Sequence, residues 1–376
     1  MVSERVWLSS PHMGEKEKLY VNEAFTTNWI APLGPNVDAF EKQVAEFVTV
    51  KGAVSLSSGT GALHLALKIL GIKKDDVVLC QSFTFAASAF PINYCDAVPV
   101  FIDSEKETWN MDPVLLEKAI KDLSSKGKKP AAIMVVHLYG MPAKMNEIIE
   151  IANRYDIPLI EDAAEALGSE YNGKACGSLG KIGILSFNGN KIITTSGGGA
   201  LTSDDELIVS KARHLSAQAK EPAAFYLHKE IGYNYRLSNV LAGIGRGQME
   251  VLPERIKKRR AIFEFYKREL GDIDGITFLS EPKGFFSNRW LTTILFDKKL
   301  GEGINEKLRL QLEKQNIETR ALWKPLHQQP VFEKCESYNN GVADELFATG
   351  LCLPSGSNIS DVNLEKVVYE IKNFLA

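Results

Sequence analysis

One lysine stands in a sequence context that could support covalent chemistry. Lys191 follows an apolar run that ends in Ser186, and three consecutive glycines at 197–199 come soon after it. Glycine allows the backbone to pack closely, and a lysine held in a tightly packed cleft can form an imine with an aldehyde. Most lysines are solvated surface groups, which is the alternative for Lys191.

A second segment could bind a phosphate group. Residues 56–70 read LSSGTGALHLALKIL, so small residues that include Gly59 and Thr60 open a predicted helix directly after a predicted strand. The free N–H groups and the positive dipole end of such a helix favour an anion. The segment matches neither a Walker A loop nor G-x-G-x-x-G, because His64 occupies the place of the third glycine. A tight turn with a serine cap is the alternative.

A carboxylate and an aromatic ring could complete a cofactor site. Asp162 ends the apolar run 157–162, where a carboxylate is costly unless it meets a partner such as a protonated pyridine nitrogen. Phe85 follows another apolar run, so its ring could stack on a flat cofactor. The alternative for Asp162 is a helix cap, and the alternative for Phe85 is packing in the core. A phosphate cradle, a pyridine partner and an imine-forming lysine together are what pyridoxal phosphate requires.

The pattern around these residues predicts the elements that position them. Short apolar runs alternate with segments of helical periodicity, which is typical of an α/β fold with a mostly parallel sheet flanked by helices. In such open sheets, ligands collect where strands end and helices begin. The predicted strands are 53–57, 76–80, 98–103, 131–137, 157–162 and 182–187.

Chain length and pattern together predict three parts. The 376 residues exceed the usual size of one core. We therefore expect an N-terminal helical segment at 1–50, a large α/β domain at 51–250 that binds the cofactor, and a smaller α+β domain at 251–376. We also expect a long helix over 239–270 that is interrupted near Pro253.

Composition argues against several classes of protein. A net charge of -3 without a concentrated basic face argues against nucleic acid as a partner. Five cysteines without a C-x-x-C pair predict neither a disulfide framework nor a metal site. Because no apolar stretch approaches the length of a membrane span and the first residues lack the apolar run of a signal peptide, we expect a cytoplasmic protein without membrane attachment.

Five ordered segments resemble those of one enzyme family. The segments SSGTGALHLAL, SFTFAASAFPI, IEDAAEALGS, SFNGNKIITTSGGG and GYNYRLSN are similar to those of the DegT/DnrJ/EryC1/StrS sugar aminotransferases, fold-type I enzymes that use pyridoxal 5'-phosphate. The resemblance extends from about residue 8 to the C-terminus. It implies a large domain with a mostly parallel sheet, a smaller α+β C-terminal domain, and a homodimer with shared active sites.

Three further segments narrow the resemblance. The opening LSSPHMGEKEKLYVNEAFTTNWIAPLGPNV, then SNRWLTTI and ETRALWKPLHQQPVF, together resemble most the bacillosamine-type enzymes that aminate C4 of a UDP-linked 4-keto-6-deoxy-N-acetylhexosamine. By this resemblance L-glutamate would donate the amino group, leaving 2-oxoglutarate and a 4-amino sugar. A dTDP- or GDP-linked keto sugar and a non-catalytic sugar-sensing regulator are alternatives. A dehydratase of the family would carry histidine in place of Lys191, and a nicotinamide dehydrogenase would need the G-x-G-x-x-G turn.

The resemblance also implies roles for individual residues. Lys191 would form the imine with the cofactor, and Glu165 stands where the family usually has Gln or His beside the phenolic oxygen of the ring. Asn234 would reach the phosphate of the neighbouring subunit, and Arg236 would help to hold the donor's carboxylate. The remaining cofactor contacts would come from Gly59, Thr60, Phe85, Asp162 and Ser186, and the sugar nucleotide would contact Trp323 and His327.

Overall fold

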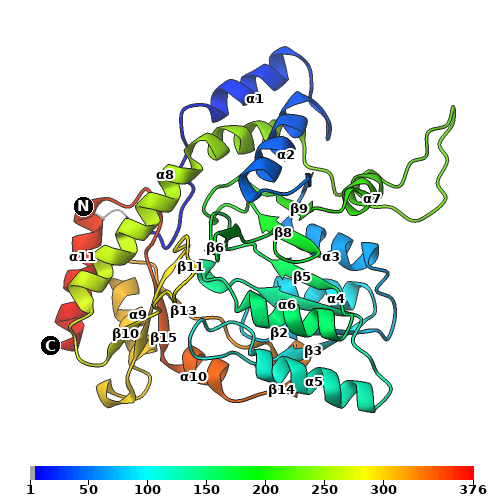
Figure 1. The fold of residues 1–376 in the computed structure, drawn as a ribbon. Coiled ribbons are helices and arrows are strands. Elements are labelled where there is room, and N and C mark those ends of the chain that lie inside the picture. Colours follow the sequence, from blue (N-terminus) through cyan, green and yellow to red (C-terminus); the bar gives the residue numbers. More distant parts are fainter. Residues whose placement is uncertain (1–4) are drawn as a thin grey trace.

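An eight-stranded mixed sheet forms the centre of the larger part of the molecule in the computed structural model, which describes residues 5–376 (Figure 1). The strand order is β1-β9-β8-β5-β4-β2-β3-β14. All pairings from β8 to β14 are parallel, whereas β9 runs antiparallel to both β8 and β1. The α/β fold class predicted from the sequence is confirmed. The strands are β1 (Gly52–Leu56), β2 (Val77–Gln81), β3 (Val98–Ile102), β4 (Ala132–Val136), β5 (Leu159–Asp162), β8 (Ile182–Ser186), β9 (Gly199–Ser203) and β14 (Ser337–Tyr338).

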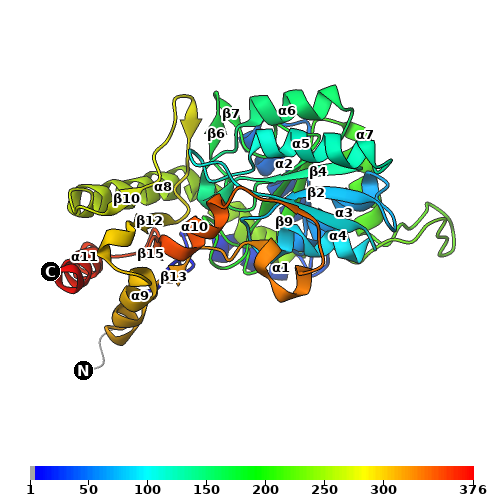
Figure 2. The same ribbon diagram turned by 90° about the horizontal axis from the view of Figure 1, so that it is seen from below.

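Helices cover both faces of this sheet, and Figure 2 shows α5 and α6 on the side opposite α3 and α4. Alternate residues of a strand point to opposite faces, so Val78 of β2 packs with α3 while Leu79 packs with α5 and α6. Both faces are therefore apolar, which explains the continuous apolar runs in the sequence. The helices are α3 (Gly59–Ile69), α4 (Phe90–Tyr94) and α7 (Glu206–Ser216) on one face, and α2 (Pro35–Val48), α5 (Pro113–Ser125) and α6 (Met145–Arg154) on the other.

One long helix, α8 (Asn239–Leu270), leads from the large part to the small part (Figure 1). It packs against α1 (Glu17–Thr26) and α2. The interruption expected near Pro253 is wrong, because the helix continues through the proline. Proline removes one helical hydrogen bond, but Leu252 and Ile256 on either side of it are anchored in the core, so packing outweighs that loss.

A four-stranded antiparallel sheet, ordered β10-β12-β15-β13, forms the smaller part. Helices α9 and α11 share an apolar core with this sheet and with the C-terminal half of α8. The strand β14 lies late in the sequence but pairs with β3 of the large sheet. The two parts are therefore joined by this strand pair as well as by α8. The remaining elements are β10 (Ile276–Phe278), β12 (Thr292–Phe296), β13 (Arg320–Ala321), β15 (Gly350–Leu353), α9 (Ile304–Lys314), α10 (Val342–Thr349), α11 (Asp361–Leu375), and a small sheet of β6 (Glu170–Tyr171), β7 (Lys174–Ala175) and β11 (Phe285–Phe286).

Residues 217–235, between α7 and α8, form an arm that extends away from the body of the molecule (Figures 1 and 2). A bridge between Ala217 and Asn234 joins its two sides at the base. Three large apolar side chains of the arm are more than two-thirds exposed: Phe225, Tyr226 and Ile231. Within residues 5–376, no helix combines the length and apolar character needed to cross a bilayer.

Candidate active site

A cavity of about 300 Å³ opens where β5 and β8 end and α3 begins. Such a position at the carboxyl ends of strands is where open α/β sheets bind ligands. The cavity brings together most of the residues that the sequence predicts for a cofactor site. Its lining includes Gly59, Thr60, Phe85, Asp162, Glu165, Ser186, Lys191 and Trp323.

The N-terminus of α3 forms one end of the cavity. Ser58 caps the helix, since its Oγ accepts a hydrogen bond from the backbone N–H of Gly61 at 2.9 Å. A Cβ atom on Gly199 would lie 2.5 Å from the backbone nitrogen of Gly59, and one on Gly59 would lie 3.2 Å from Cβ of Ser186. The glycines therefore let β8, β9 and α3 approach closely, which leaves a cradle of backbone N–H groups suited to a phosphate.

Asp162 lies in the cavity wall as a carboxylate without a protein cation. It is 5% exposed, and among the residues described none forms an ion pair with it. Oδ2 accepts a hydrogen bond from Oγ of Ser88 at 2.7 Å, and Oδ1 accepts one from the backbone N–H of Ala164 at 3.2 Å. No α-helix follows Asp162, so it does not act as a helix cap. A buried carboxylate in this position suits a protonated pyridine nitrogen.

Lys191 reaches the cavity from the loop between β8 and β9. Its Nζ lies 3.5 Å from Oε1 of Glu165 and 4.2 Å from the centre of the Trp290 ring. Its side chain is 13% exposed, so it is not a solvated surface lysine. Among the described lining residues it is the sole lysine, arginine or histidine.

Glu165 is a buried carboxyl group beside this lysine. Its Oε2 accepts a hydrogen bond from the backbone N–H of Tyr139 at 2.7 Å. Burial raises the pKa of Glu165, and the nearby ammonium of Lys191 opposes that rise only in part. The carboxyl group therefore holds its proton to higher pH in the folded protein than in the unfolded chain.

This shift predicts a pH-dependent effect of Glu165→Gln on the cofactor-free protein. As pH rises from 4.5 towards the raised pKa, the unfolded chain releases the proton and the folded protein keeps it, so folding stability falls. Glu165→Gln has no carboxyl proton to release, so its folding stability does not fall in this way. We therefore expect its Tm to exceed that of the wild type at neutral pH and to converge with it near pH 4.5. The exposed Glu170→Gln serves as a control that should not alter the pH dependence. Equal Tm differences at all pH values would contradict the expectation.

Aromatic side chains form the outer wall of the cavity. Phe85 is 54% exposed, so it is not a core residue, and its ring centre lies 5.3 Å from that of Trp323. Trp323 in turn lies parallel to Tyr139 at 6.2 Å between ring centres. The face of Phe85 is thus available to a flat ligand in the cavity.

Three predicted residues lie outside this cavity. Arg236 donates to Oε1 of Glu41 at 2.7 Å, so its guanidinium is already paired, and holding a donor's carboxylate would require that pair to open. His327 lies between Oγ of Ser82 at 2.7 Å and Oδ1 of Asp344 at 2.9 Å. Asn234 lies at the base of the arm. The structure therefore does not bring these three residues together with Lys191 in one chain.

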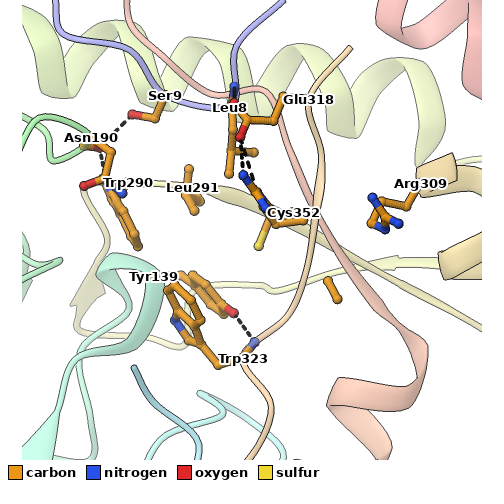
Figure 3. Close-up of a pocket in the computed structure, with 12 residues that line it drawn as sticks. Leu8, Ser9, Tyr139, Asn190, Trp290, Leu291, Arg309, Glu318, Trp323 and Cys352 are labelled. Atoms are coloured by element: carbon orange, nitrogen blue, oxygen red, sulfur yellow. Dashed lines mark hydrogen bonds and ion pairs between the residues drawn. The ribbon is translucent and has the colours of Figure 1, made fainter. Parts of the chain in front are cut away.

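A second cavity, of about 530 Å³, adjoins the first (Figure 3). The two share Asn190, Trp290 and Trp323. Arg309 and Arg320 lie in its lining, and each guanidinium is paired with a carboxylate, of Glu306 and Glu318 respectively. Leu291, Arg320, Ala321 and Cys352 of this lining come from the smaller part of the molecule.

Sequence reasoning missed the residues that support the predicted ones. Ser88 lies within the segment SFTFAAS that contains Phe85, so a serine three positions further on was a detectable signal. Trp290 comes from the smaller part of the molecule, and Tyr139 from the segment that follows β4. No local pattern places either ring beside Lys191.

Comparisons with known proteins show the family of this chain. The family model described as DegT/DnrJ/EryC1/StrS aminotransferase family matches residues 11–372. The chain is 53% identical to EpsN of Bacillus subtilis (strain 168), whose name assigns it to pyridoxal phosphate-dependent aminotransferases, over 97% of this chain and 94% of that protein. It is 38% identical to the GDP-perosamine synthase of Escherichia coli O157:H7, over 96% of this chain and 94% of that protein.

Two further comparisons concern substrate and fold. A Campylobacter jejuni protein named UDP-4-amino-4,6-dideoxy-N-acetyl-beta-L-altrosamine transaminase is 41% identical over 63% of this chain and 62% of its own length. The crystal structure of the aminotransferase TlmJ from Streptoalloteichus hindustanus superposes with a TM-score of 0.90, at 29% identity and with 98% of each chain covered.

Proposed function

Since the chain belongs to the DegT/DnrJ/EryC1/StrS aminotransferase family, it is a pyridoxal phosphate-dependent sugar aminotransferase, and we propose that it transfers the amino group of L-glutamate to C4 of a UDP-linked 4-keto-6-deoxy-N-acetylhexosamine. The products would be a 4-amino sugar and 2-oxoglutarate. The observation that carries the proposal is the convergence of Lys191, Asp162 and the start of α3 on one cavity. A regulator that only senses sugars would have no need of a partly buried lysine in that cavity.

The proposal assigns a task to each residue of the cavity. Pyridoxal phosphate supplies an aldehyde that bonds to amines and a ring that takes up electron density. Lys191 would bind that aldehyde and would be the base for the proton on Cα of the amino donor. Asp162 would hold the ring nitrogen, and Phe85 would cover one face of the ring. Contacts to the phosphate and the phenolic oxygen would come from Gly59, Thr60, Ser186 and Glu165.

The second cavity is our proposed entry site for the sugar nucleotide. It adjoins Lys191 through Trp290 and Trp323, whose rings offer apolar faces to a sugar. Arg309 and Arg320 carry the positive charge that a diphosphate requires, although binding would compete with their present carboxylate partners. Trp323 and His327 are our proposed contacts of the sugar nucleotide.

A panel of acceptors tests the choice of nucleotide. Purified holoenzyme would be given L-glutamate and UDP-, dTDP- or GDP-linked 4-keto-6-deoxy sugars, and release of 2-oxoglutarate would be measured. We expect the UDP-linked N-acetylhexosamine to give the highest kcat/KM. A preference for the GDP-linked sugar would instead align the chain with the GDP-perosamine synthase that it resembles.

We further propose that the enzyme is a homodimer with shared active sites. The arm exposes the apolar side chains of Phe225, Tyr226 and Ile231, and a second copy is a natural cover for such a surface. Asn234 at the base of this arm would then contact the phosphate bound by the neighbouring subunit. All five cysteines are free, which suits our proposal that the enzyme works in the cytoplasm.

The double variant Phe225→Asp with Ile231→Asp tests the dimer. Two buried charges at an interface cost several kcal/mol, so we expect a monomer by light scattering and a loss of at least about 100-fold in turnover. Val362→Asp, at an exposed apolar position on α11, is the matched control and should leave the assembly intact. An arm variant that stays dimeric and active would contradict the proposed interface.

A further inference from the structure

Arg259 of α8 is a buried cation whose hydrogen bonds go to neutral groups. It is 1% exposed, and among the described residues no carboxylate pairs with it. Its Nη1 donates to the backbone oxygen of Trp290 at 2.5 Å and to that of Ser355 at 3.2 Å. Its Nη2 donates to Oγ of Ser9 at 2.9 Å and to the backbone oxygen of Lys191 at 3.4 Å. One guanidinium thus ties together four segments that are far apart in the sequence.

The same segments are also bonded to each other at the residue before the lysine, and Figure 3 shows these bonds between Ser9, Asn190 and Trp290. The backbone oxygen of Asn190 accepts from Oγ of Ser9 at 2.7 Å and from Nε1 of Trp290 at 2.8 Å. Arg259 therefore holds the carbonyl of Lys191, while two of its partners hold the carbonyl of the preceding residue. Because Nζ of Lys191 lies over the Trp290 ring, the two ends of the lysine are fixed by one network.

Such a network is costly to bury. Desolvation lowers the pKa of Arg259 to about 9, and a well-packed apolar side chain would usually be cheaper at a buried position. What the guanidinium provides is geometry, since its planar fork can satisfy several acceptors in fixed directions. Three of the four acceptors belong to the Lys191 loop or to residues bonded to it, namely Lys191, Ser9 and Trp290.

We propose that Arg259 is a positioning residue for Lys191. It holds the loop 188–191 and Trp290 as one unit, so that Nζ stays over the cofactor cavity. Since α8 continues from Arg259 into the core of the smaller part, movement of that part would be transmitted to the lysine. The proposal rests on the proposed role of Lys191.

The test compares Arg259→Lys with Arg255→Lys. Arg255 lies one turn earlier on α8, is 4% exposed, and donates to the backbone oxygen of Met13, but its hydrogen bonds do not reach the Lys191 loop. In cofactor-free full-length protein, we expect amides within 187–196 to exchange with deuterium about tenfold faster in Arg259→Lys than in the wild type. We also expect about tenfold slower growth of the absorbance of lysine-bound cofactor after pyridoxal phosphate is added. Arg255→Lys should match the wild type in both measurements.

Two milder variants keep the test decisive if Arg259→Lys does not fold. Trp290→Phe and Ser9→Ala each remove one donor to Asn190, and each should speed exchange of the same peptide. The positioning role would be overturned if all three variants showed wild-type rates of deuterium exchange and of formation of lysine-bound cofactor. It would also be overturned if Arg255→Lys changed these two rates as much as Arg259→Lys does. If the wild type itself formed no lysine-bound cofactor, the proposed function would fail, whereas the exchange measurement would still report on the network.

Discussion

Lys191→Ala is expected to lower turnover by at least about four orders of magnitude and to remove the visible absorbance of lysine-bound cofactor. The side chain is the sole basic group among the described residues of the cavity lining, so nothing nearby can replace its bond or its proton transfer. Cofactor should still bind without a covalent bond, because Asp162 and the start of α3 remain. Absorbance spectra, equilibrium dialysis and steady-state rates measure these three effects.

Two further lysine variants separate covalent chemistry from charge. Lys191→Arg keeps a cation over the Trp290 ring but cannot bond to an aldehyde, so it should be as inactive as the alanine variant. Lys181→Ala, directly before β8, changes an exposed lysine and should behave as wild type. Substantial activity in either Lys191 variant would show that another residue carries the chemistry.

Asp162→Asn should reduce kcat/KM by about 100- to 1000-fold. The substitution keeps the shape of the side chain and one of the two acceptor oxygens, so only one of the hydrogen bonds from Ser88 and Ala164 can be kept as it is, and it removes the charge that would hold a protonated ring nitrogen. Affinity for pyridoxal phosphate should fall as well. Rates at saturating cofactor separate the loss of chemistry from the loss of binding.

Ser88→Ala provides the graded comparison for this prediction. It removes one hydrogen bond to the carboxylate and leaves the charge, so we expect a loss of about tenfold or less. If Asp162→Asn were as active as Ser88→Ala, the carboxylate would be a turn-forming group that binds Ala164 and not a partner of the cofactor.

The part of the site that could be predicted from the sequence lies at the carboxyl ends of three strands. Gly59 and Lys191 follow β1 and β8, Asp162 ends β5, and the carboxyl ends of parallel strands gather at one edge of an open α/β sheet. Local pattern was therefore enough to place them in one cavity. The same reasoning predicted the large sheet and the helices on both of its faces.

The unpredicted part depends on contacts between distant segments. Glu41 and Arg236 are separated by 195 positions, and no local spacing indicates that they pair. The convergence of Ser9, Trp290 and Arg259 on the lysine loop likewise arises only when the smaller part packs against the larger one. The low helix propensity of proline also led to a wrong prediction at Pro253, where packing of the residues on both sides maintains the helix.

Borohydride reduction of the holoenzyme tests the central claim most directly. The reagent converts a carbon–nitrogen double bond between a lysine and the cofactor aldehyde into a stable single bond, and peptide mass mapping then locates the modified residue. We predict that the cofactor mass appears on the peptide that contains Lys191 and on no other. Modification of a different lysine, or none while cofactor is bound, would contradict the account.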